Sequence, residues 1–135
     1  MRYDLEMVTQ LCREIGFSTR LDGDQRVDVD LCQGAVLSFV NDELEEDCLI
    51  GFLDMPWHVH GDLMFFDGRG NYVECDYLNL LTSMNEGLVL ICELEVAGRV
   101  VDRWLVHSEY NDEFRQLEES ERIIVRRAGK SNNVK

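Results

Sequence analysis

The sequence predicts an α+β fold: a mostly antiparallel, twisted sheet with helices packed on one of its faces. The apolar residues of the first segment, residues 4–15, recur at helical spacing. From Phe17 onward most segments alternate apolar and polar residues, and short glycine-containing turns separate them. Such turns join antiparallel neighbours. The 135 residues, 45% of them hydrophobic, suffice for one core. We therefore expect a single domain over residues 1–127 and a flexible tail over residues 128–135.

Residues 4–15 are predicted to form an amphipathic helix. Asp4 suits the N-cap, and Gly16 supplies a left-handed stop at the C-terminal end. The apolar face consists of Leu5, Val8, Leu11, Cys12 and Ile15.

The next segments have the period-two pattern of strands. They cover residues 17–21, 26–31, 35–40 and 48–53. Val27, Val29 and Leu31 are predicted to face the core, which places Asp28 and Asp30 on the opposite face. The continuous apolar run 48–53 predicts a strand buried on both faces.

The second half predicts a hairpin, a helix and three further strands. Gly68-Arg69-Gly70 separates two short strands, 63–67 and 71–75. Asp76 is the expected N-cap of a helix over residues 77–86. The remaining strands are predicted at 88–95, 100–107 and 121–127. The pattern of residues 108–119 does not assign them a secondary structure, and a short helix is one interpretation.

The charge of the chain indicates a basic partner. It has 27 acidic and 13 basic residues, a net charge of −14. Such an excess costs stability through self-repulsion, so a binding role is the natural explanation. Nucleic acid and anionic membranes are disfavoured as partners because they require clustered basic residues. The one basic cluster, Arg122 with Arg126 and Arg127, can equally pair with the protein's own carboxylates.

A cytoplasmic location is expected. No apolar run approaches the roughly 18–20 residues of a membrane-spanning helix, and the first residues have no apolar signal core. The five cysteines are irregularly spaced, without a Cys-x-x-Cys pair, as in reduced proteins with buried thiols.

The sequence contains no catalytic signature, so we expect a protein that is not an enzyme and needs no cofactor. One alternative is a small metal-binding protein or metalloenzyme that uses His58, His60 and His107. The stretch from His58 to Asp62 resembles the His-x-His-x-Asp motif of metallo-β-lactamase-type hydrolases. Leu63, however, stands where that family has another histidine. Cupins share the His-x-His pair but have further ligands that this chain does not match.

Carboxylates and one tryptophan are the predicted partner-binding residues. Five acidic residues crowd residues 41–47, and Trp57 follows the only proline of the chain. The predicted set is Asp28, Asp30, Asp42, Glu43, Glu45, Glu46, Asp47 and Trp57. Glu93 and Glu95 are expected to form a second acidic face.

In size, acidity and predicted fold the chain resembles immunity proteins of contact-dependent inhibition and related polymorphic toxin systems. Residues 57–107, with their hairpin, helix and strand, have the look of such proteins, and the resemblance is one of general character. It implies that the partner is a cognate basic toxin domain, inhibited by occlusion of its functional surface. A type III-like secretion chaperone or adaptor, usually a dimer with an apolar groove, is a further alternative.

Overall fold

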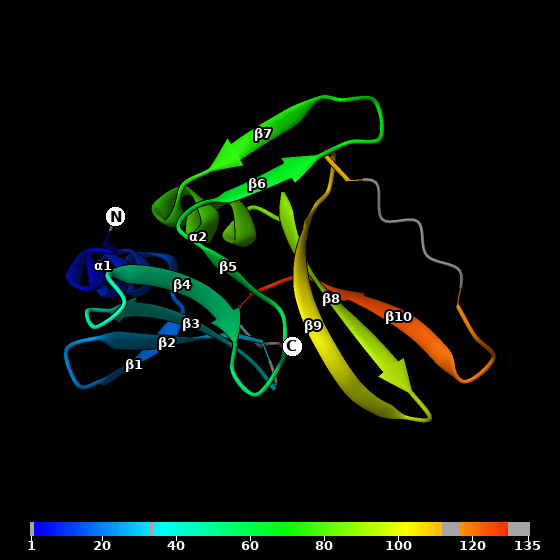
Figure 1. The fold of residues 1–135 in the computed structure, drawn as a ribbon, viewed down its shortest axis with the longest axis horizontal. Helices are drawn as coiled ribbons and strands as arrows, with labels where there is room; N and C mark the ends of the chain where they lie inside the picture. The colour runs from blue at the N-terminus through cyan, green and yellow to red at the C-terminus, as the bar shows by residue number, and fades with distance from the viewer. Residues whose placement is uncertain (1, 33, 112–116, 130–135) are drawn as a thin grey trace.

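The computed structural model describes residues 2–32, 34–111 and 117–129. Within these ranges the chain forms two helices and ten strands, and all strand pairs are antiparallel. The predicted α+β class is confirmed (Figure 1). The elements, in chain order, are α1 (Leu5–Ile15), β1 (Ser18–Asp22), β2 (Arg26–Cys32), β3 (Ala35–Asp42), β4 (Asp47–Phe52), β5 (His58–His60), β6 (Leu63–Phe66), β7 (Tyr72–Cys75), α2 (Tyr77–Asn85), β8 (Val89–Val96), β9 (Arg99–His107) and β10 (Glu121–Arg126).

The strands form three sheets and not the single sheet that the sequence suggested. Strands β1 to β5 follow one another in a five-stranded meander, β10, β8 and β9 form a three-stranded sheet, and β6 and β7 form a separate hairpin. Helix α2 lies between β7 and β8 in the chain, so it interrupts the strand succession. The sequence pattern shows which segments are strands, but it does not show where one sheet ends.

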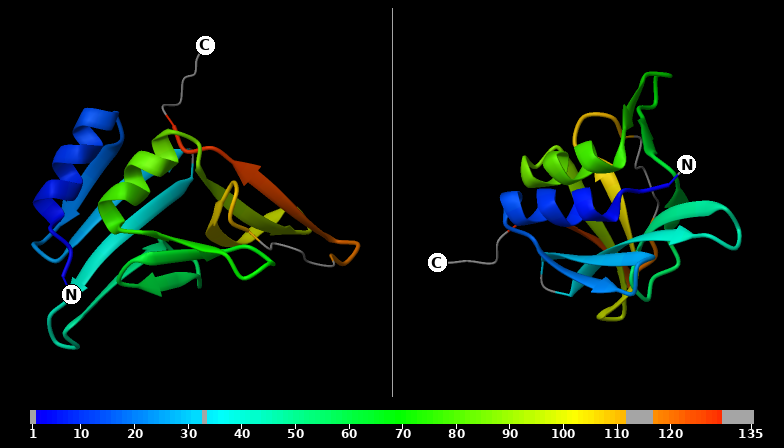
Figure 2. Two further views of the ribbon diagram at one scale, coloured as in Figure 1. Left: turned by 90° about the horizontal axis from the view of Figure 1, so that it is seen from above. Right: turned by 90° about the vertical axis from the view of Figure 1, so that its left-hand side faces the viewer.

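The two helices pack side by side over the sheets (Figure 2). Helix α1 contacts β1 and β2, and α2 contacts β8. Val27, Val29 and Leu31 are fully buried, as their alternation predicted. Leu21 in β1 is 56% exposed, because β1 is the edge strand of its sheet.

The predicted helix boundaries are confirmed within one residue. The Asp4 side chain accepts a hydrogen bond from the Met7 backbone, and Gly16 has a left-handed conformation with φ of 106°. The Asp76 side chain accepts hydrogen bonds from the backbone N–H groups of Leu78 and Asn79. Local cap and stop residues therefore define both helices.

The packed chain extends beyond the expected end of the domain at residue 127. Ala128 is only 2% exposed, and the Gly129 backbone N–H donates to the Leu31 carbonyl oxygen at 2.8 Å. These two residues were predicted to belong to the tail, and they are instead anchored on β2. Residues 112–116, where a short helix was considered, and residues 130–135 lie outside the described residues.

Candidate partner-binding surface

The acidic turn, residues 42–47, projects from the five-stranded sheet between β3 and β4. Asp42 and Asp47 face each other as the last register pair of the two strands. Like charges placed directly opposite repel each other, so this pair is a source of local destabilisation. The four residues between them are exposed, and Leu44 at the tip is 95% exposed. The turn thus presents an apolar side chain surrounded by carboxylates.

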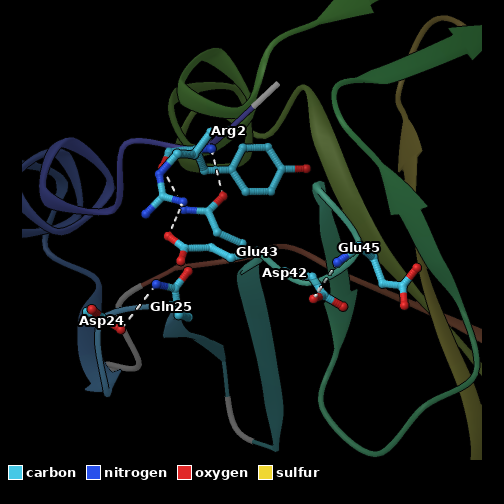
Figure 3. Close-up of polar contacts among 8 residues, drawn as sticks. Arg2, Asp24, Gln25, Asp42, Glu43 and Glu45 are labelled. Carbon is cyan, nitrogen blue, oxygen red and sulfur yellow. Dashed lines mark hydrogen bonds and ion pairs between the residues drawn. The ribbon is translucent and has the colours of Figure 1, made fainter.

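The base of the acidic turn is held by the N-terminal segment. The Asn41 side chain accepts from the Tyr3 backbone N–H at 2.8 Å and donates to the Tyr3 carbonyl oxygen at 2.9 Å. The buried Tyr3 hydroxyl donates to the Gly61 carbonyl oxygen. Arg2 pairs with Glu43 across 2.8 Å, as Figure 3 shows. Contacts distant in sequence therefore fix the position of the turn.

The carboxylates of the acidic turn differ in how they are compensated. The Asp42 side chain accepts from the Glu45 backbone N–H at 3.2 Å. Asp47 accepts from the Cys48 backbone N–H at 2.8 Å and contacts His60 Nδ1 at 2.6 Å. These two hydrogen bonds lower the pKa of the Asp47 carboxyl group.

Glu45 and Glu46 carry the uncompensated charge of the acidic turn. Within the described part of the chain neither carboxylate forms an ion pair. In Figure 3 the Glu45 carboxylate points away from the pair that Arg2 forms with Glu43. The tip of the turn therefore keeps its negative charge available to another molecule.

Most arginine pairs lie elsewhere in the molecule. Arg26 lies 2.6 Å from Asp22, and Arg122 lies 3.0 Å from Glu95. Arg126 contacts Glu93 at 2.6 Å. The expectation that the basic cluster can pair with the protein's own carboxylates is confirmed for Arg122 and Arg126, whereas Arg127 donates to the Asn85 carbonyl oxygen at 2.9 Å. At the acidic turn the described cations pair only with Glu43 and Asp47, which leaves Glu45 and Glu46 without an ion pair.

Asp28 is not part of an exposed acidic surface, contrary to the prediction. It does lie on the face opposite Val27 and Val29, but it is only 3% exposed. Ser38 Oγ donates to it at 2.7 Å, and Arg26 and Arg20 lie 3.1 and 3.5 Å from its carboxylate. The two arginines cover the carboxylate, and strand alternation alone does not show such cover.

Asp30 is exposed but lies apart from the acidic turn. It pairs with Val36 at the beginning of β3, whereas Gln25 and Asn41 meet at the other end of the same strands. Five residues of extended strand, at about 3.3 Å each, place Asp30 roughly 16 Å from that end. The predicted partner-binding carboxylates therefore do not form one surface.

Glu93 and Glu95 do not form the expected second acidic face. Glu93 is 1% exposed and pairs with both Arg103 and Arg126. Glu95 is half-buried and pairs with Arg122. They share a strand face, as the period of two requires, but arginines of β9 and β10 neutralise them.

Trp57 is half-buried and separates two hollows. Its ring lies against Phe52, with 5.9 Å between the ring centroids. One hollow, of about 280 Å³, lies over the outer face of the five-stranded sheet. The other, of about 340 Å³, is lined by residues of β5, β6 and β9, and we call it the edge groove. Sequence reasoning selected Trp57 but missed the edge groove, because its walls come from three separate segments.

The three histidines do not converge on one point. His58 and His60 are exposed on β5, with 5.1 Å between their ring centroids. His107 is buried against Phe65 and Tyr110, and its Nδ1 accepts from the Tyr110 backbone N–H at 3.2 Å. Burial lowers the pKa of His107. Among the described residues no group of three potential ligands has the geometry of a metal site.

The five cysteines, all in described segments, are free thiols. Burial raises the pKa of Cys12 to about 12 and also raises the pKa of Cys32 and Cys75. Because the thiolate is the reactive form, these three are poor nucleophiles at neutral pH.

Comparisons with protein-family models, curated proteins and solved structures give no significant match. Neither described helix is long and apolar enough to cross a membrane.

Proposed function

We propose that this chain is a cytoplasmic acidic protein that binds and neutralises a basic protein partner, namely an immunity protein that blocks a cognate toxin domain. The observation that supports this proposal is the acidic turn. It combines a 95% exposed Leu44 with the uncompensated carboxylates of Glu45 and Glu46. A net charge of −14 gives the whole molecule an attractive field for such a partner.

The proposed mechanism is occlusion, without a chemical step. Long-range attraction speeds the encounter, and charge complementarity selects a basic partner. Leu44 enters an apolar pocket of the partner, and the neighbouring carboxylates pair with basic residues at the rim of that pocket. A basic side chain placed between Asp42 and Asp47 also relieves their mutual repulsion.

The first experiment is a pull-down of the tagged protein from its native cells at low and high salt. A basic partner is expected to be captured at low salt and weakened at high salt, because salt screens exposed charges. The captured protein is then tested for toxicity alone and in the presence of this chain. Capture of no basic protein at either salt concentration would contradict the proposal.

Two variants locate the binding surface. Leu44→Ala, and Glu45→Gln combined with Glu46→Gln, are expected to weaken capture of the partner by at least about tenfold. The matched control is Glu118→Gln combined with Glu119→Gln, which removes the same charge from two other exposed residues. Equal weakening by both charge variants would mean that only net charge matters and that the acidic turn is not the site.

The two alternative functions predict different results for the same purified protein. A secretion chaperone or adaptor would be a dimer that binds an unfolded segment. A metal protein would retain zinc on purification and lose it in His60→Ala. A metal-free monomer that captures a folded toxin favours the immunity protein.

A further inference from the structure

His58 and His60 place two imidazole rings side by side on β5. The residues are two apart in a strand, so their side chains point to the same face of the sheet. Both side chains are exposed, and their ring centroids lie 5.1 Å apart. The function proposed above does not use either histidine. The pair is therefore a candidate for a separate role.

The Nδ1 atom of each ring already has a hydrogen-bond partner. His58 Nδ1 lies 3.1 Å from the Pro56 carbonyl oxygen, which can only accept, so Nδ1 carries the proton. His60 Nδ1 donates in the same way to an Asp47 carboxylate oxygen at 2.6 Å. In a neutral imidazole the lone pair is then on Nε2. Histidines that bind metal ions have this arrangement, with one nitrogen on the ion and the other donating to a carbonyl or carboxylate oxygen.

The two hydrogen bonds also orient the rings. Pro56 precedes His58 in the chain, and Asp47 lies beyond His60, because the antiparallel register pairs Leu49 with His60. Both acceptors are therefore on the outer sides of the histidine pair. The Cδ2–Nε2 edge of an imidazole lies across the ring from Nδ1, so this edge of each ring is on the side of the other histidine.

The separation of the rings matches that of two histidines that share one ion. An ion bound at about 2.1 Å by both Nε2 atoms lies about 3.2 Å from each ring centre, and a near-tetrahedral angle at the ion then separates the two centres by about 5.2 Å. The observed separation is 5.1 Å. The hollow of about 280 Å³ that His58 borders gives space for water at the remaining positions of the ion.

We propose that His58 and His60 form a site for a divalent transition-metal ion, Cu²⁺ or Zn²⁺, which keeps water at its remaining positions. Imidazole suits both ions, and Cu²⁺ is the more tightly bound of the two. The net charge of −14 raises the concentration of cations around the protein. Asp47 positions the His60 ring and is not itself a ligand.

This site differs from the metalloprotein alternative, which also uses the buried His107. Two protein ligands hold an ion less firmly than the three or four ligands of catalytic and structural zinc sites. The ion therefore exchanges, and the purified protein is expected to be free of metal. The inference goes beyond the function proposed above, because it requires no partner protein.

The test is a titration of the untagged full chain with CuCl₂, followed by electron paramagnetic resonance. The spectrum is expected to show two equatorial nitrogen ligands, and binding should saturate at one ion per chain with a Kd below about 10 μM. Mg²⁺ at about 1 mM should not compete, because it prefers oxygen ligands. Calorimetry with ZnCl₂ measures the affinity of the same site for an ion without redox chemistry.

His58→Gln and His60→Gln are each expected to weaken Cu²⁺ binding by at least about tenfold and to leave one nitrogen ligand. The matched control is His60→Gln combined with Leu21→His, which keeps three histidines in the chain. Leu21 is exposed on β1, at the opposite edge of the same sheet. Four strand spacings, roughly 19 Å, separate β1 from β5, so the control should bind no better than His60→Gln alone.

Asp47→Ala tests the positioning of His60. It removes the hydrogen-bond acceptor and no ligand, so both nitrogen ligands should remain while the affinity falls about tenfold. Asp30→Ala removes the same charge from an exposed residue of the same sheet, and its affinity should stay within about twofold of the original chain.

Three outcomes would overturn the inference. The first is a spectrum with fewer than two nitrogen ligands, which includes coordination by carboxylate oxygens alone. The second is unchanged affinity in His60→Gln, and the third is full affinity in the control that contains Leu21→His. No partner protein enters these experiments, so their failure is distinguishable from failure of the immunity proposal.

Discussion

The buried carboxylate of Glu93 gives the strongest test of how this fold is stabilised. It is 1% exposed and accepts hydrogen bonds from Arg103 Nε at 2.5 Å and Arg126 Nε at 2.6 Å. Burial opposes its ionisation, but the two guanidinium groups outweigh burial and lower the pKa of Glu93. Ion pairs of this carboxylate therefore link β8 to both of its neighbouring strands, β9 and β10.

Glu93→Gln keeps the size of the side chain and removes its charge. Arg103, whose side chain is only 12% exposed, is then left as a cation without a counter-ion. Breaking such a buried pair costs about 3–5 kcal/mol. Arg126 is 44% exposed and can be solvated by water, so we expect the lower end, about 3 kcal/mol. For a domain of this size, that loss lowers the melting temperature by roughly 10–15 °C.

Urea unfolding followed by tryptophan fluorescence measures the free energy of unfolding directly. Glu95→Gln is the matched control on the same strand, since its partner Arg122 is 69% exposed, and its cost should be below about 1 kcal/mol. Glu93→Gln combined with Arg103→Leu should recover part of the loss by removing the orphaned cation. If Glu93→Gln and Glu95→Gln cost the same, the buried ion pairs are not a main source of stability.

Three further results are expected. Gly51→Ala should lower the free energy of unfolding by about 1–3 kcal/mol, because its Cβ would lie 3.1 Å from the Trp57 carbonyl oxygen. Gly129→Ala is the control, since its Cβ would meet no atom within 4 Å and the substitution should be neutral. Thermal unfolding of the two variants measures the difference. Cys12 should resist alkylation at pH 8 in the folded protein and react fully in urea, because burial raises its pKa to about 12. Because the pKa of Glu93 is lowered in the folded protein, its ionisation contributes stability above the ordinary carboxyl pKa of about 4.3. This stability is lost as the pH falls through the pKa of the folded state. Unfolding curves from pH 7 to pH 3 should therefore show a smaller loss of stability in Glu93→Gln than in the original chain.

The candidate site was only partly predictable from the sequence. The acidic turn is a run of neighbouring carboxylates, so its position between two strands followed from local pattern alone. The exposure of Leu44 at the tip could not be predicted from the sequence, because a leucine at this position is equally compatible with burial in the core. The edge groove was not predictable either, since β5, β6 and β9 meet only in the folded chain.

The local features of the fold follow from the sequence alone. Asp4 and Asp76 cap helices through backbone groups within three residues, and Val27, Val29 and Leu31 alternate toward the core as any half-buried strand does. These features depend on bond geometry and on neighbours a few positions away.

The surroundings of each charged side chain depend on the tertiary structure. Asp28 lies on the predicted face, yet Ser38 and two arginines cover it. Glu93 meets Arg126 across 33 positions of sequence. Whether a carboxylate is solvated, paired or available to a partner depends on which distant side chains the fold brings to it. The periodicity of a strand specifies the direction of a side chain but not the charge that it meets there.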